Sequence, residues 1–334
     1  MTEGSLLKVS GLRTEFATYR GALVAVDGVS LALRRGETLA LVGESGCGKS
    51  VTALSVMRLV RRPGRITAGK VMFEGQDLLR RTRREMQRLR GSRIAMVFQD
   101  PLSTLNPAFT LETQISESLR VHRVARGREA RERSVELLAA MGIPSPSERL
   151  HSYPHELSGG MRQRVMIAIA VSCSPDLLIA DEPTTALDVT LQVQIMDLLA
   201  EIKRTRGLSI ILITHDLGIV SQFSDRAAVM YAGRIVEQAS VSELLGRPLH
   251  PYTEGLVGCI PRLGRPDVPI TPIEGTVPDL VRPPVGCRFA PRCPRATDRC
   301  VASEPPDYRL ESDRIVRCYL HEKSSLASSG EETG

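Results

Sequence analysis

The stretch Gly43 to Ser50 (GESGCGKS) has the spacing G-x-x-x-x-G-K-[ST], which is typical of a loop that binds phosphate. Its glycines let the backbone curl so that successive N–H groups face phosphate oxygens, and the helix that follows adds partial positive charge. We expect Lys49 to reach the β- and γ-phosphates and Ser50 to bind Mg²⁺. The expected nucleotide contacts here are Gly43, Ser45, Gly46, Gly48, Lys49, Ser50 and Val51.

Two adjacent carboxylates, Asp181 and Glu182, follow the apolar run 177–180 (LLIA). Two acids at the end of a buried strand are costly without a cation, and a site for metal and phosphate accounts for both. We expect Asp181 to hold Mg²⁺ through water and Glu182 to orient or deprotonate an attacking water.

Gln99 and His215 also stand directly after apolar runs. In open parallel sheets, ligands bind at the carboxyl ends of strands. The amide of Gln99 can therefore reach Mg²⁺ or a water near the γ-phosphate, and the imidazole of His215 can face that phosphate. Taken alone, each is also explained as a surface glutamine or a structural histidine.

Ser158, Gly159 and Gly160 precede a further apolar helix and predict a second anion-binding helix N-terminus, although a serine-capped helix accounts for them equally well. Phe16 and Tyr19 lie where one predicted strand gives way to the next. Either ring can stack on a nucleotide base, and simple packing is the alternative.

These residues need a parallel sheet to hold them together. Its predicted strands are 38–42, 94–98, 177–180 and 209–214, each ending beside one of the groups above. Loose alternation predicts two antiparallel strands before the phosphate loop, and charged helical patterns predict a helical insertion within the sheet. The remaining predicted elements are strands at 6–16, 22–33 and 69–75, and helices at 51–60, 80–90, 110–150 and 193–207.

Bulk composition fits a globular protein of one large domain and a smaller one, with 334 residues, 42% hydrophobic and 25% charged. The longest uncharged apolar run, 165–173, is far too short to span a membrane, and no secretory signal is evident. We therefore expect a cytoplasmic protein, whose seven cysteines are metal ligands or free thiols. Residues 58–93 carry twelve Lys/Arg against three acids, which predicts either a solvated face or attraction to an anionic membrane surface.

The motifs together resemble the ATP-binding subunit of ABC transporters over residues 5–260. The resemblance implies an α/β fold, a P-loop NTPase of ABC type with a mixed core sheet, an antiparallel β subdomain and a helical subdomain at about 100–172. Residues 43–50 resemble the Walker A loop, Gln99 the Q-loop, and 157–163 (LSGGMRQ) the signature. The other matches are Asp181 and Glu182 at the end of Walker B, Ala186 to Asp188 as the D-loop, His215 as the switch histidine, and Phe16 ahead of Tyr19 as the adenine-stacking ring.

The family resemblance also implies how the second glycine motif works. Two such domains pack head to tail, so that Ser158, Gly159 and Gly160 serve the partner's ATP. Glu182 accepts the proton of the attacking water, while Lys49, Mg²⁺ and His215 offset the developing charge. Both half-sites are intact in this chain, which predicts active hydrolysis of ATP to ADP and phosphate.

Three stretches resemble the oligopeptide/dipeptide importers within the family: 98–107 (FQDPLSTLNP), 250–253 (HPYT) and 286–294 (GCRFAPRCP). This implies peptide import at the cytoplasmic face of the membrane, with a second related ATPase, two permeases that dock near 103–109, and an external binding protein, but no nucleic acid. The same machinery can import nickel complexes, cell-wall peptides or oligosaccharides. A soluble ABC ATPase of translation or DNA repair is a remote alternative.

Four cysteines lie within residues 261–322, a segment rich in Pro and Arg and without helical periodicity. They are Cys287, Cys293, Cys300 and Cys318, with the spacing C-x5-C-x6-C-x17-C. This is not the short C-x2-C pattern of structural zinc, and four thiolates suit a [4Fe–4S] cluster, which some related importers carry. Zinc and unmetallated thiols remain open. Residues 323–334 are predicted to be a disordered tail.

Overall fold

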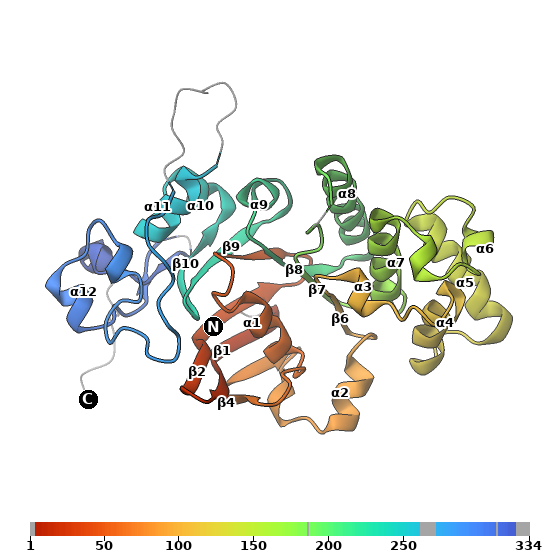
Figure 1. The fold of residues 1–334 in the computed structure, drawn as a ribbon, viewed down its shortest axis with the longest axis horizontal. Helices are drawn as coiled ribbons and strands as arrows, with labels where there is room; N and C mark the ends of the chain where they lie inside the picture. Colours follow the sequence, from red (N-terminus) through yellow and green to blue (C-terminus); the bar gives the residue numbers. More distant parts are fainter. Residues whose placement is uncertain (1–3, 186, 261–271, 312, 325–334) are drawn as a thin grey trace.

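A computed structural model describes residues 4–185, 187–260, 272–311 and 313–324 (Figure 1). Its largest element is an eight-stranded mixed sheet in the order β11-β12-β10-β9-β3-β8-β7-β6. The strands β9, β3, β8, β7 and β6 run parallel, while β10, β12 and β11 extend the sheet antiparallel. Their bounds are β3 Thr38–Val42, β6 Ile94–Val97, β7 Leu177–Asp181, β8 Ser209–Thr214, β9 Arg226–Tyr231, β10 Arg234–Ser240, β11 Tyr308–Arg309 and β12 Ile315–Val316.

A second, antiparallel sheet has the order β2-β1-β4-β5. Its two long strands, β1 (Ser5–Thr18) and β2 (Gly21–Arg34), pair from Ser5 opposite Arg34 to Thr18 opposite Gly21. The two predicted antiparallel strands are thus confirmed. The sheet is completed by β4 (Gly64–Phe73) and β5 (Gln76–Asp77).

Alternation along the buried strands determines which layer each side chain joins. In β3, Leu39 and Leu41 pack toward α1 and the antiparallel sheet, whereas Ala40 and Val42 pack on the other face with β9. Because the parallel strands are covered on both faces, they read as continuous apolar runs in the sequence. The carboxyl ends of β3, β8, β7 and β6 therefore lie side by side at one edge.

Helix α1 (Lys49–Val56) is shorter than the predicted helix 51–60. Arg58 adopts a positive φ of 51°, and Leu59 N–H donates to the carbonyl of Leu54. This 6→1 hydrogen bond is a Schellman ending, here built on an arginine where glycine is usual. The sequence offers no glycine at this point, so the early stop was not predictable.

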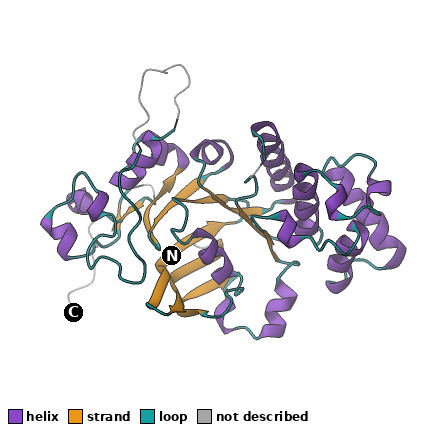
Figure 2. Cartoon of the chain, in the orientation of Figure 1, coloured by secondary structure: helices purple, strands orange, loops and turns teal. Residues whose placement is uncertain are grey.

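The predicted helical insertion is present between β6 and β7. Figure 2 shows it as a group of helices, and Figure 1 places α4 to α6 at the opposite end of the molecule from α12, with α1 between them. The insertion packs onto the sheet through a shared apolar core that includes Ile115, Leu138 and Val165. It comprises α3 Pro101–Thr104, α4 Leu111–Val121, α5 Gly127–Ala140, α6 Pro146–Arg149 and α7 Gly159–Val171.

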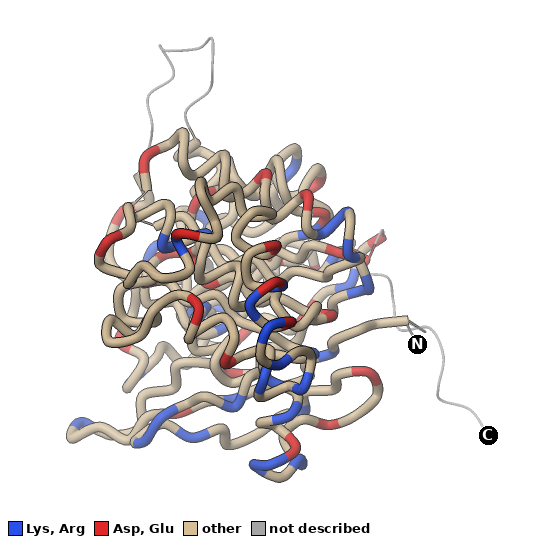
Figure 3. Tube along the Cα trace, turned by 90° about the vertical axis from the view of Figure 1, so that its right-hand side faces the viewer, with Lys and Arg blue, Asp and Glu red and all other residues tan. Residues whose placement is uncertain are grey.

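The Arg-rich stretch folds into β4 and α2 (Arg83–Leu89), whose N-cap Thr82 forms a capping box with Glu85. Figure 3 shows Lys and Arg concentrated in the lower part of the molecule, where the antiparallel sheet lies. Not all of these arginines face solvent freely, because Arg58 and Arg90 donate to backbone carbonyls. No helix within the described ranges is long and apolar enough to cross a membrane.

The described residues after 271, namely 272–311 and 313–324, contain more regular structure than the sequence suggested. They contain α12 (Asp298–Ala302) and the strands β11 and β12, of which β12 pairs with β10. Of the predicted disordered tail, Lys323 and Ser324 belong to a 3₁₀ turn, and the rest lies outside the described residues. The other helices are α8 Val189–Arg206, α9 Leu217–Phe223, α10 Val241–Gly246 and α11 Pro251–Gly258, with 3₁₀ turns at Leu78–Arg80, Pro154–Glu156, Ala290–Arg292 and Tyr319–Ser324.

Candidate functional site

The phosphate loop connects β3 to α1, as its motif predicted. A Cβ at Gly43 would lie 2.1 Å from the carbonyl oxygen of Met230, and one at Gly48 would lie 2.3 Å from that of Ala25. Both glycines have positive φ, 153° and 106°, so only glycine fits there. The loop is therefore pressed against β9 and β2, which fixes its backbone N–H groups around one site.

Lys49 is buried and lies across the loop. Its Nζ donates to the carbonyl oxygens of Gly43 (2.7 Å) and Glu44 (3.0 Å). Both carbonyls are neutral, so the ammonium group of Lys49 can exchange them for phosphate oxygens.

Ser50, in the first turn of α1, lies beside Asp181, the last residue of β7. The Ser50 hydroxyl donates to Asp181 Oδ1 at 2.9 Å. Asp181 is 5% exposed, and this burial raises its carboxyl pKa, while the Ser50 hydrogen bond acts in the opposite direction. A divalent cation would lower that pKa and stabilise the carboxylate.

Glu182 lies at the centre of the polar groups at this edge. Its carboxylate accepts from Gln99 Nε2 at 3.0 Å and lies 3.4 Å from His215 Nδ1. Glu182 also has a positive φ of 46°, unusual for a side chain of this size, and its N–H donates to Ile213 O. The structure thus brings together the three strand-end residues that the sequence predicted.

Thr185 is a contact that the sequence analysis missed. Its hydroxyl donates to Glu182 Oε2 at 2.9 Å, so Glu182 has a third polar neighbour. The only signal for it was its place three residues after Glu182 in a turn.

The second glycine motif lies apart from these groups. Ser158 caps α7 by accepting from Met161 N–H, and Asp188 caps α8 by accepting from Leu191 N–H. Within the part of the chain that the structure describes, no hydrogen bond joins Ser158, Gly159, Gly160 or Asp188 to the phosphate loop. Ser158 and Gly159 are exposed, while a Cβ at Gly160 would lie 3.1 Å from Leu191. Ala186 of the predicted D-loop lies outside the described residues.

The two candidate stacking aromatics differ in environment. Phe16 lies on β1 with its ring packed against Gly64. A Cβ added to Gly64 would lie 2.5 Å from Cε1 of that ring. Tyr19 lies in the turn after β1 and is 98% exposed. Which of them stacks on a base stays a prediction.

The four C-terminal cysteines line one cavity of about 220 Å³, beside Phe289 and Arg299. Burial raises the thiol pKa of Cys287, Cys293 and Cys318, and the neighbouring cysteines raise it further. Among the described residues, however, no group of three or more His, Cys, Asp or Glu side chains is arranged to hold a metal ion. The donor type fits an iron–sulfur cluster but the arrangement does not, so the predicted [4Fe–4S] cluster is not supported.

The groups at the strand ends fit Mg²⁺ better. This cation takes oxygen ligands and is typically bound by one or two protein oxygens together with substrate phosphates. Ser50 and Asp181 supply two converging oxygens beside Lys49, which suits that pattern. The chemistry they can support is displacement at a phosphate by a water that Glu182 contacts.

Comparison with known proteins gives matches along most of the chain. A family model described as "ABC transporter" matches residues 26–185, and one described as "Oligopeptide/dipeptide transporter, C-terminal region" matches residues 236–300. A third, described as "AAA domain, putative AbiEii toxin, Type IV TA system", matches the shorter stretch 151–221.

Relatives cover nearly the whole length. The chain is 48% identical to the dipeptide transport ATP-binding protein DppD of Bacillus subtilis (strain 168), over 95% of each chain. It is 48% identical to the oligopeptide transport ATP-binding protein AppD of the same strain, over 97% of this chain and 99% of that one. A putative peptide import ATP-binding protein of Brucella melitensis is 51% identical over 94% of each chain.

Solved structures show the same fold. The cbiO1 subunit of Clostridium perfringens, part of the ABC transporter complex cbiONQ, has a TM-score of 0.63 and 31% identity, covering 73% of this chain and 92% of that one. The ATP-binding cassette MJ0796, in a dimeric post-hydrolysis state with ADP and Pi, has a TM-score of 0.64 and 26% identity, covering 70% of this chain and 98% of that one.

Proposed function

This chain belongs to the ATP-binding subunits of ABC transporters, in their oligopeptide/dipeptide branch, and we propose that it hydrolyses ATP to power the import of di- and oligopeptides. The observation that carries the catalytic part is the convergence on Glu182 of Gln99 and His215, beside the Ser50–Asp181 pair. These groups come from four neighbouring strand ends, where this class of sheet binds its ligand.

Each residue has a distinct role in this proposal. Glu182 orients the attacking water and accepts its proton, with Thr185 and Gln99 fixing the carboxylate. Lys49 leaves its two loop carbonyls to bind the β- and γ-phosphates, and His215 faces the γ-phosphate. Ser50 and Asp181, with Gln99 as a further candidate ligand, would hold Mg²⁺, which would supply positive charge to the phosphates. The rest of the phosphate contact comes from loop N–H groups.

The exposure of the signature supports the proposal of a second subunit. Ser158 and Gly159 are exposed at the N-terminus of a thirteen-residue helix and, together with Gly160, are not joined to this chain's own phosphate loop. We propose that Ser158, Gly159, Gly160 and Asp188 contribute to the ATP site of a related ATPase that packs head to tail with this chain. The dimeric cassette with ADP and Pi shows that this fold can pair.

The cargo assignment rests on the relatives. Two relatives that match over nearly the whole chain are named as dipeptide and oligopeptide transport proteins, and the C-terminal family model carries a similar description. We propose two membrane permeases and an external binding protein as partners, which places the chain at the cytoplasmic face of the membrane. Nickel complexes, cell-wall peptides and oligosaccharides remain alternative cargoes, because an ATPase subunit does not contact cargo.

The test is phosphate release by the assembled transporter with Glu182→Gln. We expect turnover to fall by about 10²-fold or more, because the base is lost while the shape is kept. Glu201→Gln, on the exposed surface of α8, is the matched control and leaves turnover unchanged. Equal hydrolysis by the Glu182 variant and the wild type would overturn the assignment.

Two finer points stay predictions. The first is the iron–sulfur cluster, for which the convergence of four cysteines on one cavity is the only support. Iron, zinc and sulfide analysis after anaerobic purification separates a cluster from zinc and from free thiols, and colourless protein without iron rejects the cluster.

The second is the division into an ATPase domain at 5–260, with its helical subdomain at about 100–172, a C-terminal domain at 261–322 and a tail at 323–334. The pairing of β12 with β10 joins the C-terminal residues to the main sheet. Limited proteolysis near residue 261 should therefore leave two fragments that stay associated, as native mass spectrometry can show.

A further inference from the structure

A buried arginine from the C-terminal segment holds the phosphate loop. The guanidinium of Arg292 donates to both carboxylate oxygens of Glu44, at 2.8 and 3.0 Å. Glu44 is the second residue of the loop motif, 248 positions away in the sequence. Two parallel charge-assisted hydrogen bonds fix both the distance and the orientation of the pair.

Glu44 is also held through its backbone. Its N–H donates to the Tyr252 hydroxyl at 2.9 Å, and its carbonyl accepts from Lys49 Nζ at 3.0 Å. A continuous chain of contacts therefore runs from Arg292 through Glu44 to Lys49, the lysine that we assign to the phosphates.

The environment of Arg292 makes this contact specific. Its side chain is 5% exposed, and its guanidinium lies 5.7 Å from the ring centre of Tyr231 and 5.9 Å from that of Phe289. Its other hydrogen bonds go to the backbone carbonyls of Ile273 and Glu274 and to the Tyr231 hydroxyl. A lysine lacks the planar fork needed to make these contacts at once.

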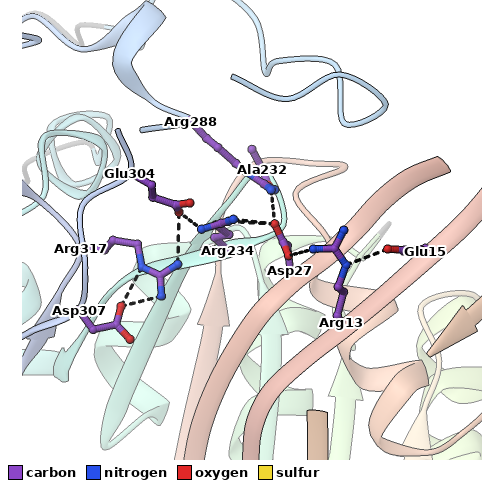
Figure 4. Close-up of polar contacts among 9 residues, drawn as sticks. All are labelled: Arg13, Glu15, Asp27, Ala232, Arg234, Arg288, Glu304, Asp307 and Arg317. Atoms are coloured by element: carbon purple, nitrogen blue, oxygen red, sulfur yellow. Dashed lines mark hydrogen bonds and ion pairs between the residues drawn. The ribbon is translucent and has the colours of Figure 1, made fainter. Parts of the chain in front are cut away.

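A second arginine anchors the same segment on the other side of the loop. Arg288 donates to Asp27 on β2 and to the carbonyl of Ala232, within the network that Figure 4 shows. The next residue, Gly233, donates its N–H to the carbonyl of Cys47 in the phosphate loop. The segment therefore contacts both ends of the loop, directly at Glu44 and through Gly233 at Cys47.

We propose that Arg292 is a positioning residue for ATP, acting through Glu44 on the shape and charge of the phosphate loop. This inference rests on the proposed function and extends the nucleotide site to the C-terminal segment. Arg292 offsets a carboxylate that would otherwise repel the phosphates, and it fixes the loop in the form that accepts them.

Equilibrium binding of ATP to the full-length chain tests the proposal. We expect Arg292→Gln to weaken binding about tenfold, because it leaves Glu44 unpaired beside the phosphates. Arg292→Lys, which keeps charge but not the fork, should fall between this variant and the wild type. Adding Glu44→Gln to Arg292→Gln should cause no further loss, since the two residues act as one unit.

Arg20→Gln is the matched control. Arg20 also pairs with the C-terminal segment, at Asp279, but both side chains are exposed and neither touches the loop. It should bind ATP like the wild type. In the assembled transporter, Arg292→Gln should raise KM for ATP and leave kcat nearly unchanged, which a general loss of folded protein would not do.

The proposal fails if Arg292→Gln binds ATP within about twofold of the wild type, or if its effect and that of Glu44→Gln simply multiply. Either result is distinct from failure of the proposed function. If the proposed function itself were wrong, the wild-type chain would bind no ATP, or Glu182→Gln would hydrolyse ATP normally.

Discussion

The catalytic edge, which comprises Lys49, Ser50, Gln99, Asp181, Glu182 and His215, uses charged residues in the opposite way to the C-terminal anchor. By this anchor we mean the ion pairs that join Arg288, Arg292 and Arg314 to Asp27, Glu44 and Glu237. At the edge, His215 is 65% exposed and lies 3.4 Å from Glu182, and Lys49 donates to the neutral carbonyls of Gly43 and Glu44. In the anchor, Glu237 is fully buried and accepts from Arg314 at 2.6 Å and from the N–H groups of Leu249 and His250. The edge leaves charge available for a ligand, whereas in the anchor the carboxylate of Glu237 is hydrogen-bonded within the chain.

This difference indicates what each region does for the molecule. Removing one partner of a buried ion pair is strongly destabilising, because the other charge is left uncompensated. A charge with loose, neutral partners costs little to rearrange when a phosphate arrives. Substitutions should therefore separate the two regions, with stability lost in the anchor and turnover lost at the edge.

The largest expected effect on stability is at Glu237. We expect Glu237→Gln to lower the free energy of unfolding by about 3–5 kcal/mol, because it leaves Arg314 buried without its partner. Urea unfolding followed by circular dichroism measures this. Glu132→Gln, which breaks the exposed Arg128–Glu132 pair, is the control and should cost no more than about 0.5 kcal/mol. Equal losses of unfolding free energy in the two variants would show that the buried pair contributes no more to stability than an exposed one.

The next effect is at Lys49. We expect Lys49→Met to reduce ATP turnover by about 10²–10³-fold, since a preorganised positive group at the phosphates is lost while the chain length is kept. Phosphate release by the assembled transporter measures the rate. In the absence of nucleotide, the free energy of unfolding should fall far less in Lys49→Met than in Glu237→Gln. If Lys49→Met lost stability but retained turnover, Lys49 would have a structural role and not a catalytic one.

The catalytic edge could be predicted from the sequence because each of its residues belongs to a short motif or follows a short apolar run. The loop spacing fixes 43–50 within one strand–helix unit, and Gln99, Glu182 and His215 each follow a short apolar run. Once those runs become neighbouring parallel strands, their ends must meet. The prediction thus needed only the element types and their order.

The anchor could not be predicted in the same way. Arg292 and Glu44 are 248 residues apart, and β11 and β12 have two residues each, too short for any periodic signal. The cysteine spacing predicted a metal cluster in this segment, whereas the segment's described direct contact with the loop is made by Arg292. The early end of α1 at Val56 also depends on a positive φ at Arg58, which residue type does not favour.

The smallest effect concerns the pH dependence of the anchor, at Asp27. Burial raises the pKa of this carboxyl, but Arg234, Arg288 and Arg13 together outweigh burial, so its pKa is lowered in the folded chain. A lowered carboxyl pKa stabilises the fold above the unfolded value near pH 4, and that contribution is lost as the pH falls toward the folded pKa.

Asp27→Asn removes this titration while keeping the side chain's shape. At pH 7 the variant should be less stable than the wild type, because three arginines lose their shared carboxylate. The difference in unfolding free energy should be constant from pH 7 to pH 5 and should begin to narrow below about pH 4. Urea titrations of both proteins at pH 7, 5 and 3 measure it. A difference that stays the same or widens at pH 3 would show that Asp27 stabilises the anchor by shape and hydrogen bonding, and not by its charge.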